Sequence, residues 1–137
     1  MTIKQARTLC LKWQERLRLM DWDVKLRWAR KSEAESVWGL CEKDIHAKTA
    51  TIILARTNHP DWENQDHPRD PETIIVHELM HLHTAPFDFV IGSPHHTTEE
   101  NLVNHTARLL VALDRRDESV MNGGRPLSRR ASIRPMT

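Results

Sequence analysis

The chain contains no tyrosine, only two cysteines and no long run of apolar residues. The two cysteines, Cys10 and Cys41, allow at most one disulfide, which excludes a small fold held together by a disulfide framework. No segment approaches the ~20 apolar residues of a transmembrane helix, and the N-terminal residues lack the apolar core of a signal peptide. We therefore expect a protein of the reducing cytoplasm with no membrane partner.

An excess of charge of one sign is also absent, because the formal net charge of the 137 residues is +1. No strong field therefore favours nucleic acid as the main partner. Residues 122–137 are the exception, with four arginines and no acidic residue. We expect one domain over residues 1–117, and a disordered basic tail over 118–137 that binds nucleic acid only weakly and in a salt-dependent way.

The spacing of apolar residues predicts an α+β fold. Apolar positions three and four residues apart are typical of amphipathic helices, whereas alternation and short β-branched runs are typical of strands. Along the chain we expect helix 2–20, strands 22–28, 37–43 and 49–55 in a small sheet, helix 71–84, and helix 97–117. The inner face predicted for the last helix consists of Leu102, Val103, Thr106, Leu109, Leu110 and Leu113. Residues 56–70 form a long polar loop, in which His59 and His67 are interpreted as solvated.

The segment TIIVHELMHLHTA, residues 73–85, contains the motif His77-Glu78-Leu79-Met80-His81. Residues four apart share one face of a helix, so His77 and His81 can bind one metal ion together. Glu78 lies about 100° further round the helix, where its carboxylate can take a proton from a zinc-bound water whose pKa is lowered to about 7. A solvated pair of histidines is the alternative, but the apolar neighbours of the motif favour a buried site, because unpaired polar groups are costly to bury.

A hydrolytic zinc site needs a third protein ligand. The metzincin pattern is excluded, because Thr84 and Phe87 stand where that pattern has glycine and histidine. His83 would lie on the far side of the helix from His81. Glu99, Glu100 and His96 remain as candidates near the start of the last helix. For Glu100 the alternative is a capping box with Thr97, in which the glutamate only caps the helix.

An HExxH motif followed on the next helix by Glu100-x-x-x-Asn104 resembles the gluzincin zinc metallopeptidases. The extended pattern to Ala107 is similar to that of the ImmA/IrrE-type peptidases, and the order of elements over residues 1–115 resembles the minigluzincins and phage-encoded metallopeptidases. The resemblance implies a zinc metalloendopeptidase with His77, His81 and Glu100 as Zn²⁺ ligands. It also implies that Glu78 is the general base, that Asn104 supports a ligand histidine, and, for a phage-encoded protein, action in the host cytoplasm.

His96, fifteen residues after His81, gives a second resemblance, to the SprT-like proteases that act on DNA-associated proteins. That pattern expects Gly-His-Gly and an aromatic residue, whereas this chain has Ser-Pro-His-His-Thr at residues 93–97. A non-catalytic metal-binding module is the third interpretation. It is supported by the absence of tyrosine, because many gluzincins stabilise the oxyanion with Tyr or His. In this chain an arginine or one of His95, His96 and His105 would have to do so.

The expected substrate is a peptide or protein segment. We expect it to add as an extra strand along an exposed edge of residues 49–55, because main-chain hydrogen bonds bind a peptide with little choice of sequence.

Overall fold

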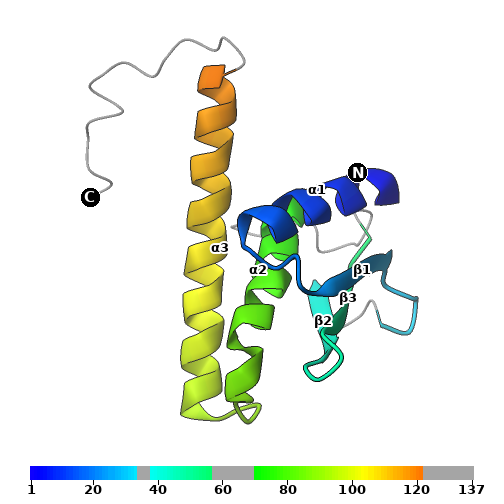
Figure 1. The fold of residues 1–137 in the computed structure, drawn as a ribbon, viewed down its shortest axis with the longest axis vertical. Coiled ribbons are helices and arrows are strands. Elements are labelled where there is room, and N and C mark those ends of the chain that lie inside the picture. The colour runs from blue at the N-terminus through cyan, green and yellow to red at the C-terminus, as the bar shows by residue number, and fades with distance from the viewer. Residues whose placement is uncertain (34–37, 57–69, 122–137) are drawn as a thin grey trace.

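A computed structural model describes residues 1–33, 38–56 and 70–121. The elements are α1 (Ile3–Arg16), β1 (Asp23–Trp28), β2 (Gly39–Asp44), β3 (Thr49–Leu54), α2 (Pro71–Thr84), the 3₁₀ helix η1 (Ala85–Phe87) and α3 (Pro94–Met121). The predicted α+β class and order of elements are confirmed (Figure 1). The helices of the described residues include none that is long and apolar enough to cross a membrane. The polar loop with His59 and His67, and the tail beyond Met121, lie outside the described residues.

The three strands are ordered β1-β3-β2, so β3 lies in the centre of the sheet. It pairs in parallel with β1 and antiparallel with β2. The prediction that residues 49–55 offer an exposed edge is therefore wrong. The physical reason lies in the sequence of β3, where Ile52, Ile53 and Leu54 are all buried. A continuous apolar run is typical of a strand that is covered on both faces, and β3 is in addition paired along both of its edges.

Helices α1 and α2 pack on the sheet, and α3 lies beside α2, away from the sheet (Figure 1). The core between these layers includes Trp13, Leu26, Ile52, Leu79 and Val111. Helix α1 ends at Arg16 instead of the predicted residue 20. The chain reverses at Arg18, which has a positive φ of 60°, and the Gln14 side chain then donates to the Leu19 carbonyl at 3.0 Å. Apolar residues continue the helical spacing past the point where this turn ends the helix.

Helix α3 begins at Pro94, three residues before the predicted start. The Ser93 hydroxyl accepts a hydrogen bond from the His96 N–H at 3.2 Å, which is the bond that an N-cap residue makes. Thr97 lies inside the helix and donates to the Ser93 carbonyl, which excludes the alternative of a capping box between Thr97 and Glu100.

The inner face of α3 is also only partly as predicted. Leu102, Leu109 and Leu113 are exposed, whereas Val103, Ala107 and Val111 are buried. Apolar residues form two stripes on this helix, and periodicity alone does not say which one packs. The smaller residues face α2, since short side chains let two helices approach closely.

Strand β1 is an edge strand whose outward carbonyl oxygens accept hydrogen bonds from side chains. Asp23 N–H donates to Lys48 O at 2.9 Å, so alternate residues of β1, among them Leu26 and Trp28, direct their main-chain groups away from β3. Leu26 O accepts from Arg7 Nε, and Trp28 O accepts from Arg27 Nη1, each at 3.2 Å. Just before the strand, Trp22 O accepts from Gln14 Nε2 at 2.6 Å. Side chains therefore cap this edge.

Strand β2 forms the opposite edge, and its outward groups are open. Ala55 N–H donates to Trp38 O at 2.9 Å, so the alternation directs the main-chain groups of Gly39, Cys41 and Lys43 away from β3. Among the residues that the structure describes, these groups have no hydrogen-bond partner. The open edge of the sheet is therefore β2, on the side that faces α2.

Candidate metal centre

Helix α2 carries the HExxH motif and has a well-defined N-terminus. The Asp70 side chain accepts from the Glu72 N–H at 3.0 Å and caps the N-terminus, and Pro71 occupies the first position. The residues that pack into the core are Ile75, Val76, Leu79 and Leu82. His77 and His81 lie one turn apart and face the first turns of α3, where they contact glutamates.

The side-chain atoms of His77, His81 and Glu100 form a compact triangle. The two Nε2 atoms are 3.1 Å apart. The Glu100 oxygens lie 3.3 Å from Nε2 of His77 and 3.0 Å from Nε2 of His81. A tetrahedral zinc ion with bonds of about 2.0–2.1 Å separates its ligand atoms by about 3.3 Å. The spacing of these three side chains therefore fits a zinc ion, and Glu100 stands where the gluzincin resemblance places the third ligand.

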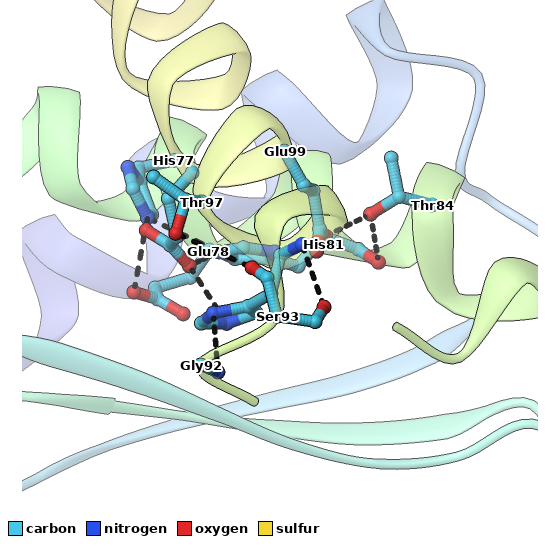
Figure 2. Close-up of polar contacts among 10 residues, drawn as sticks. His77, Glu78, His81, Thr84, Gly92, Ser93, Thr97 and Glu99 are labelled. Carbon is cyan, nitrogen blue, oxygen red and sulfur yellow. Dashed lines mark hydrogen bonds and ion pairs between the residues drawn. The ribbon is translucent and has the colours of Figure 1, made fainter. Parts of the chain in front are cut away.

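Further side chains orient the two imidazole rings. Asn104 lies close enough to His77 to influence the pKa of its imidazole through hydrogen bonding, and its role in supporting a ligand histidine stays a prediction. Glu99 lies 2.9 Å from Nδ1 of His81, on the far side of the ring from Nε2, and accepts from the Thr84 hydroxyl at 2.5 Å (Figure 2). Glu99 is a rival third ligand in the sequence, but the structure places it as a partner of Nδ1 of His81. Such contacts fix the tautomer and the orientation of a metal-binding imidazole.

The charge states of these side chains suit a cation. Burial, followed by the neighbouring His81, lowers the pKa of His77, and the neutral imidazole is the form that binds metal. Burial raises the pKa of Glu99, but hydrogen bonds from Thr84 and His81 outweigh it and leave that pKa below its ordinary value. Glu99 therefore adds negative charge behind His81.

Glu78 lies beside the triangle. Its Oε1 is 3.9 Å from Nε2 of His77, farther than either Glu100 contact, although His77, Glu78 and His81 all offer ligand atoms within 4.8 Å of one another. Its side chain is only 9% exposed, and burial, followed by the charge of Glu100, raises its pKa to about 8. A nearby cation would oppose both effects. The position suits a proton carrier better than a ligand.

Gly39 lets strand β2 approach Glu78 closely. A Cβ atom at this position would lie 2.6 Å from Ile74 Cγ2 and 3.2 Å from Glu78 Cγ. The Ile74 methyl belongs to a stiff β-branched side chain, so any larger residue would push β2 away from α2. Gly39 is not among the site residues predicted from the sequence. A glycine inside a strand, which often marks close approach of another segment, was the available signal.

A cavity of about 390 Å³ connects these groups. Its walls come from β2, α2, the connector between α2 and α3, and the first turns of α3. His96 lines it, with Nε2 3.9 Å from a Glu100 oxygen, and its Nδ1 accepts from the Gly92 N–H at 3.4 Å (Figure 2). His95 stacks on Phe89 instead, and His105 is exposed on α3. Thus, of the three histidines considered as oxyanion stabilisers, His96 is the one beside the triangle.

Comparisons of the chain with family models, with curated proteins and with solved structures find no match. The gluzincin and SprT-like resemblances therefore stay predictions from the sequence. Inference about function depends on the side-chain geometry itself.

Proposed function

We propose that this chain is a zinc-dependent metallopeptidase whose metal ligands are His77, His81 and Glu100. The observation that carries the proposal is the triangle of two Nε2 atoms and one carboxylate with sides of 3.0–3.3 Å. Two histidines and one carboxylate are a ligand set of catalytic zinc sites, which leave a further coordination position open. The Glu100 side chain is 36% exposed, so the site has access to solvent.

The chain's own residues supply the remaining parts of a hydrolytic site. A zinc ion held there would act as a Lewis acid and make a water molecule acidic enough to lose a proton near neutral pH. Glu78 is the group placed to take that proton and to pass it to the amine that leaves when the peptide bond breaks. Asn104 and Glu99 keep the two histidines in place while this happens.

His96 is our candidate for the oxyanion donor in a chain without tyrosine. Because the Gly92 N–H donates to Nδ1 of His96, a neutral ring carries its proton on Nε2. That Nε2 points toward Glu100, so it offers a hydrogen-bond donor on the cavity side. Donors aimed at developing negative charge stabilise the transition state of acyl transfer.

The substrate segment pairs with β2 instead of β3. Gly39, Cys41 and Lys43, whose main-chain groups point away from β3, line the same cavity as His77 and Glu78. A peptide that adds as a strand to this edge would gain main-chain hydrogen bonds beside the zinc ligands. Its recognition by main-chain groups leaves most side chains of the substrate free to vary.

A cytoplasmic location is part of the proposal. Cys10 and Cys41 are both free thiols. Burial raises the pKa of Cys10 to about 11 and that of Cys41 to about 12, with the charge of Glu78 adding to the latter. Two unpaired, poorly ionised thiols fit a protein of a reducing compartment.

The test is the Glu78→Gln variant, which keeps the shape of the side chain and removes the carboxylate that would accept the proton. We expect it to retain zinc and to lose peptide cleavage by about 10²- to 10⁴-fold, the usual contribution of general acid–base catalysis. The matched control is His105→Gln, an exposed change on α3 that leaves both properties unchanged. Cleavage by Glu78→Gln at the wild-type rate would contradict the assigned role. A wild-type protein that binds zinc and cleaves no peptide would instead be a metal-binding module.

A further inference from the structure

The connector between α2 and α3 places apolar side chains in water beside the candidate metal centre. Ile91 is 86% exposed and Phe89 is half-buried. Across the cavity, Leu40 of β2 is 40% exposed. All three line the cavity that contains His77 and Glu78. Leu40, Phe89 and Ile91 are called the apolar rim below.

The connector holds the rim in a defined position. The Phe89 ring stacks on Phe87 at 5.6 Å and on His95 at 5.9 Å. Ser93 N–H donates to Val90 O at 3.0 Å, and Gly92 has a φ of +85°, as the third residue of a type II turn does. Ile91 is therefore the residue at the tip of a tight turn. Folding buries little of its side chain, so its apolar surface is available to another molecule.

The rim is continuous with the path proposed for the substrate. The rim residues line the same cavity as Gly39 and Cys41 of the open β2 edge and as the proposed zinc ligands His77, His81 and Glu100. Alternate side chains of an added strand point to the same side. A strand on β2 would therefore direct every second side chain near the reacting bond toward the connector.

We propose that the apolar rim selects substrates, so that the cleaved peptides carry a large aliphatic or aromatic side chain close to the scissile bond. This inference rests on the proposed peptidase function and adds a substrate class to it. Main-chain pairing on β2 binds any extended peptide, whereas the rim favours those whose side chain covers Ile91 and Phe89. The energy comes from removing apolar surface from water.

The experiment uses the zinc-loaded full chain and a peptide library made by digesting a whole proteome. Mass spectrometry of the products should show enrichment of large apolar residues within a few positions of the cleaved bonds. Ile91→Ser should then lower the ratio of kcat/KM for an apolar peptide to that for its serine analogue by roughly fivefold, as expected for covering about half of an isoleucine side chain. The matched control is Val90→Ser, because Val90 is 74% exposed on the same connector and does not line the cavity.

Failure of the inference can be told apart from failure of the peptidase proposal. Cleavage with no apolar preference, or an unchanged ratio in Ile91→Ser, would overturn the inference and leave the peptidase standing. If the protein cleaves nothing, fluorescence anisotropy of labelled peptides replaces kinetics, and weaker binding of the apolar peptide to Ile91→Ser alone would still support the inference. A wild-type dimer that Ile91→Ser converts to monomer would overturn it, because the rim would then be an interface between copies.

Discussion

The two edges of the small sheet differ in the hydrogen bonding of their outward main-chain groups. On the β1 edge, outward carbonyls accept hydrogen bonds from the side chains of Gln14, Arg7 and Arg27. On the β2 edge, the outward groups of Gly39, Cys41 and Lys43 have no hydrogen-bond partner within the part of the chain that the structure describes, and these three residues line the cavity of the candidate metal centre. An open edge invites pairing with another chain, so proteins usually cover it. The difference supports the proposal that a substrate strand pairs with β2 and not with β1.

The N-terminal and C-terminal parts of the described chain also differ in charge. Residues 1–31, which contain α1 and β1, have nine basic and three acidic residues, whereas residues 70–121, which contain α2 and α3, have three basic and nine acidic ones. Arginines of the first region cap the β1 edge. Glutamates of the second region surround the two histidines, where negative charge attracts a metal cation.

The largest loss of stability is expected when the Glu72 side chain, which connects α2 to α1, is removed. Glu72 is 10% exposed and accepts from Trp13 Nε1 at 2.6 Å and from Lys12 Nζ at 3.2 Å, so it holds α1 against α2. Glu72→Ala leaves Trp13 Nε1 without its acceptor, whereas Lys12 keeps Asp114 as a partner at 2.7 Å. The change should lower the free energy of unfolding by about 3 kcal/mol, because a buried hydrogen bond to a charged group is lost. Urea denaturation measures this, and Glu15→Ala, an exposed change on α1, should stay within about 0.5 kcal/mol.

The same variant should change the dependence of stability on pH. Burial raises the pKa of Glu72, but hydrogen bonds from Trp13 and Lys12 outweigh it and lower that pKa overall. The stabilisation by Glu72 is therefore present above the unfolded pKa of about 4.3 and is lost as the pH falls through the lower folded pKa. The wild-type protein should lose more stability than Glu72→Ala in this acid range. An equal loss in both would contradict the assignment.

The next change removes a single cap of the β1 edge. Gln14 is buried and donates to Leu19 O and Trp22 O, and Gln14→Ala leaves both carbonyls without this donor. We expect a loss of about 2–3 kcal/mol, seen as a fall in Tm of roughly 10–15 °C. Zinc binding should not change, because the site lies on other elements. Lys4→Ala, on the exposed side of α1, is the control, and equal effects of the two changes would argue against the capping role.

The smallest effect is expected when one main-chain donor of the open β2 edge is removed. Lys43→Pro removes an outward N–H, and an edge strand tolerates proline where the N–H faces away from its neighbour. Compared with Lys43→Ala, it should lower kcat/KM for a peptide by about fivefold, since one hydrogen bond contributes about 1 kcal/mol. The comparison isolates the main-chain group, because both variants lack the lysine side chain. Equal rates in the two variants would mean that the substrate does not pair with β2 at this residue.

Local patterns explain which features could be predicted from the sequence. His77 and His81 share a helix face because residues four apart always do, and the helix itself is marked by Asp70 and Pro71. The approach of Glu100 to these histidines depends on how α3 packs against α2. Spacing alone left Glu100, Glu99 and His96 open, and the choice of Glu100 came from a resemblance.

Features that depend on packing were missed or mistaken. The central place of β3 follows from its two partners, which periodicity does not identify, although the run Ile52–Leu54 was a usable signal. The contact of Thr84 with Glu99 joins two helices, and the need for glycine at residue 39 comes from the methyl of Ile74. None of these contacts lies within one element. A local pattern such as the run Ile52–Leu54 or a glycine inside a strand can therefore mark the residue, but it does not identify the partner.

The measurement that tests the central claim most directly is zinc bound per chain in the wild-type protein and in separate Glu100→Ala, Glu99→Ala and His96→Ala variants. The proposed site predicts one zinc in the wild type, loss of zinc with Glu100→Ala, weaker binding by about 10- to 100-fold with Glu99→Ala, and retention with His96→Ala. Retention of zinc by Glu100→Ala together with its loss in His96→Ala would contradict the account and favour the SprT-like ligand set. A wild-type protein that binds no zinc would contradict the metal site itself.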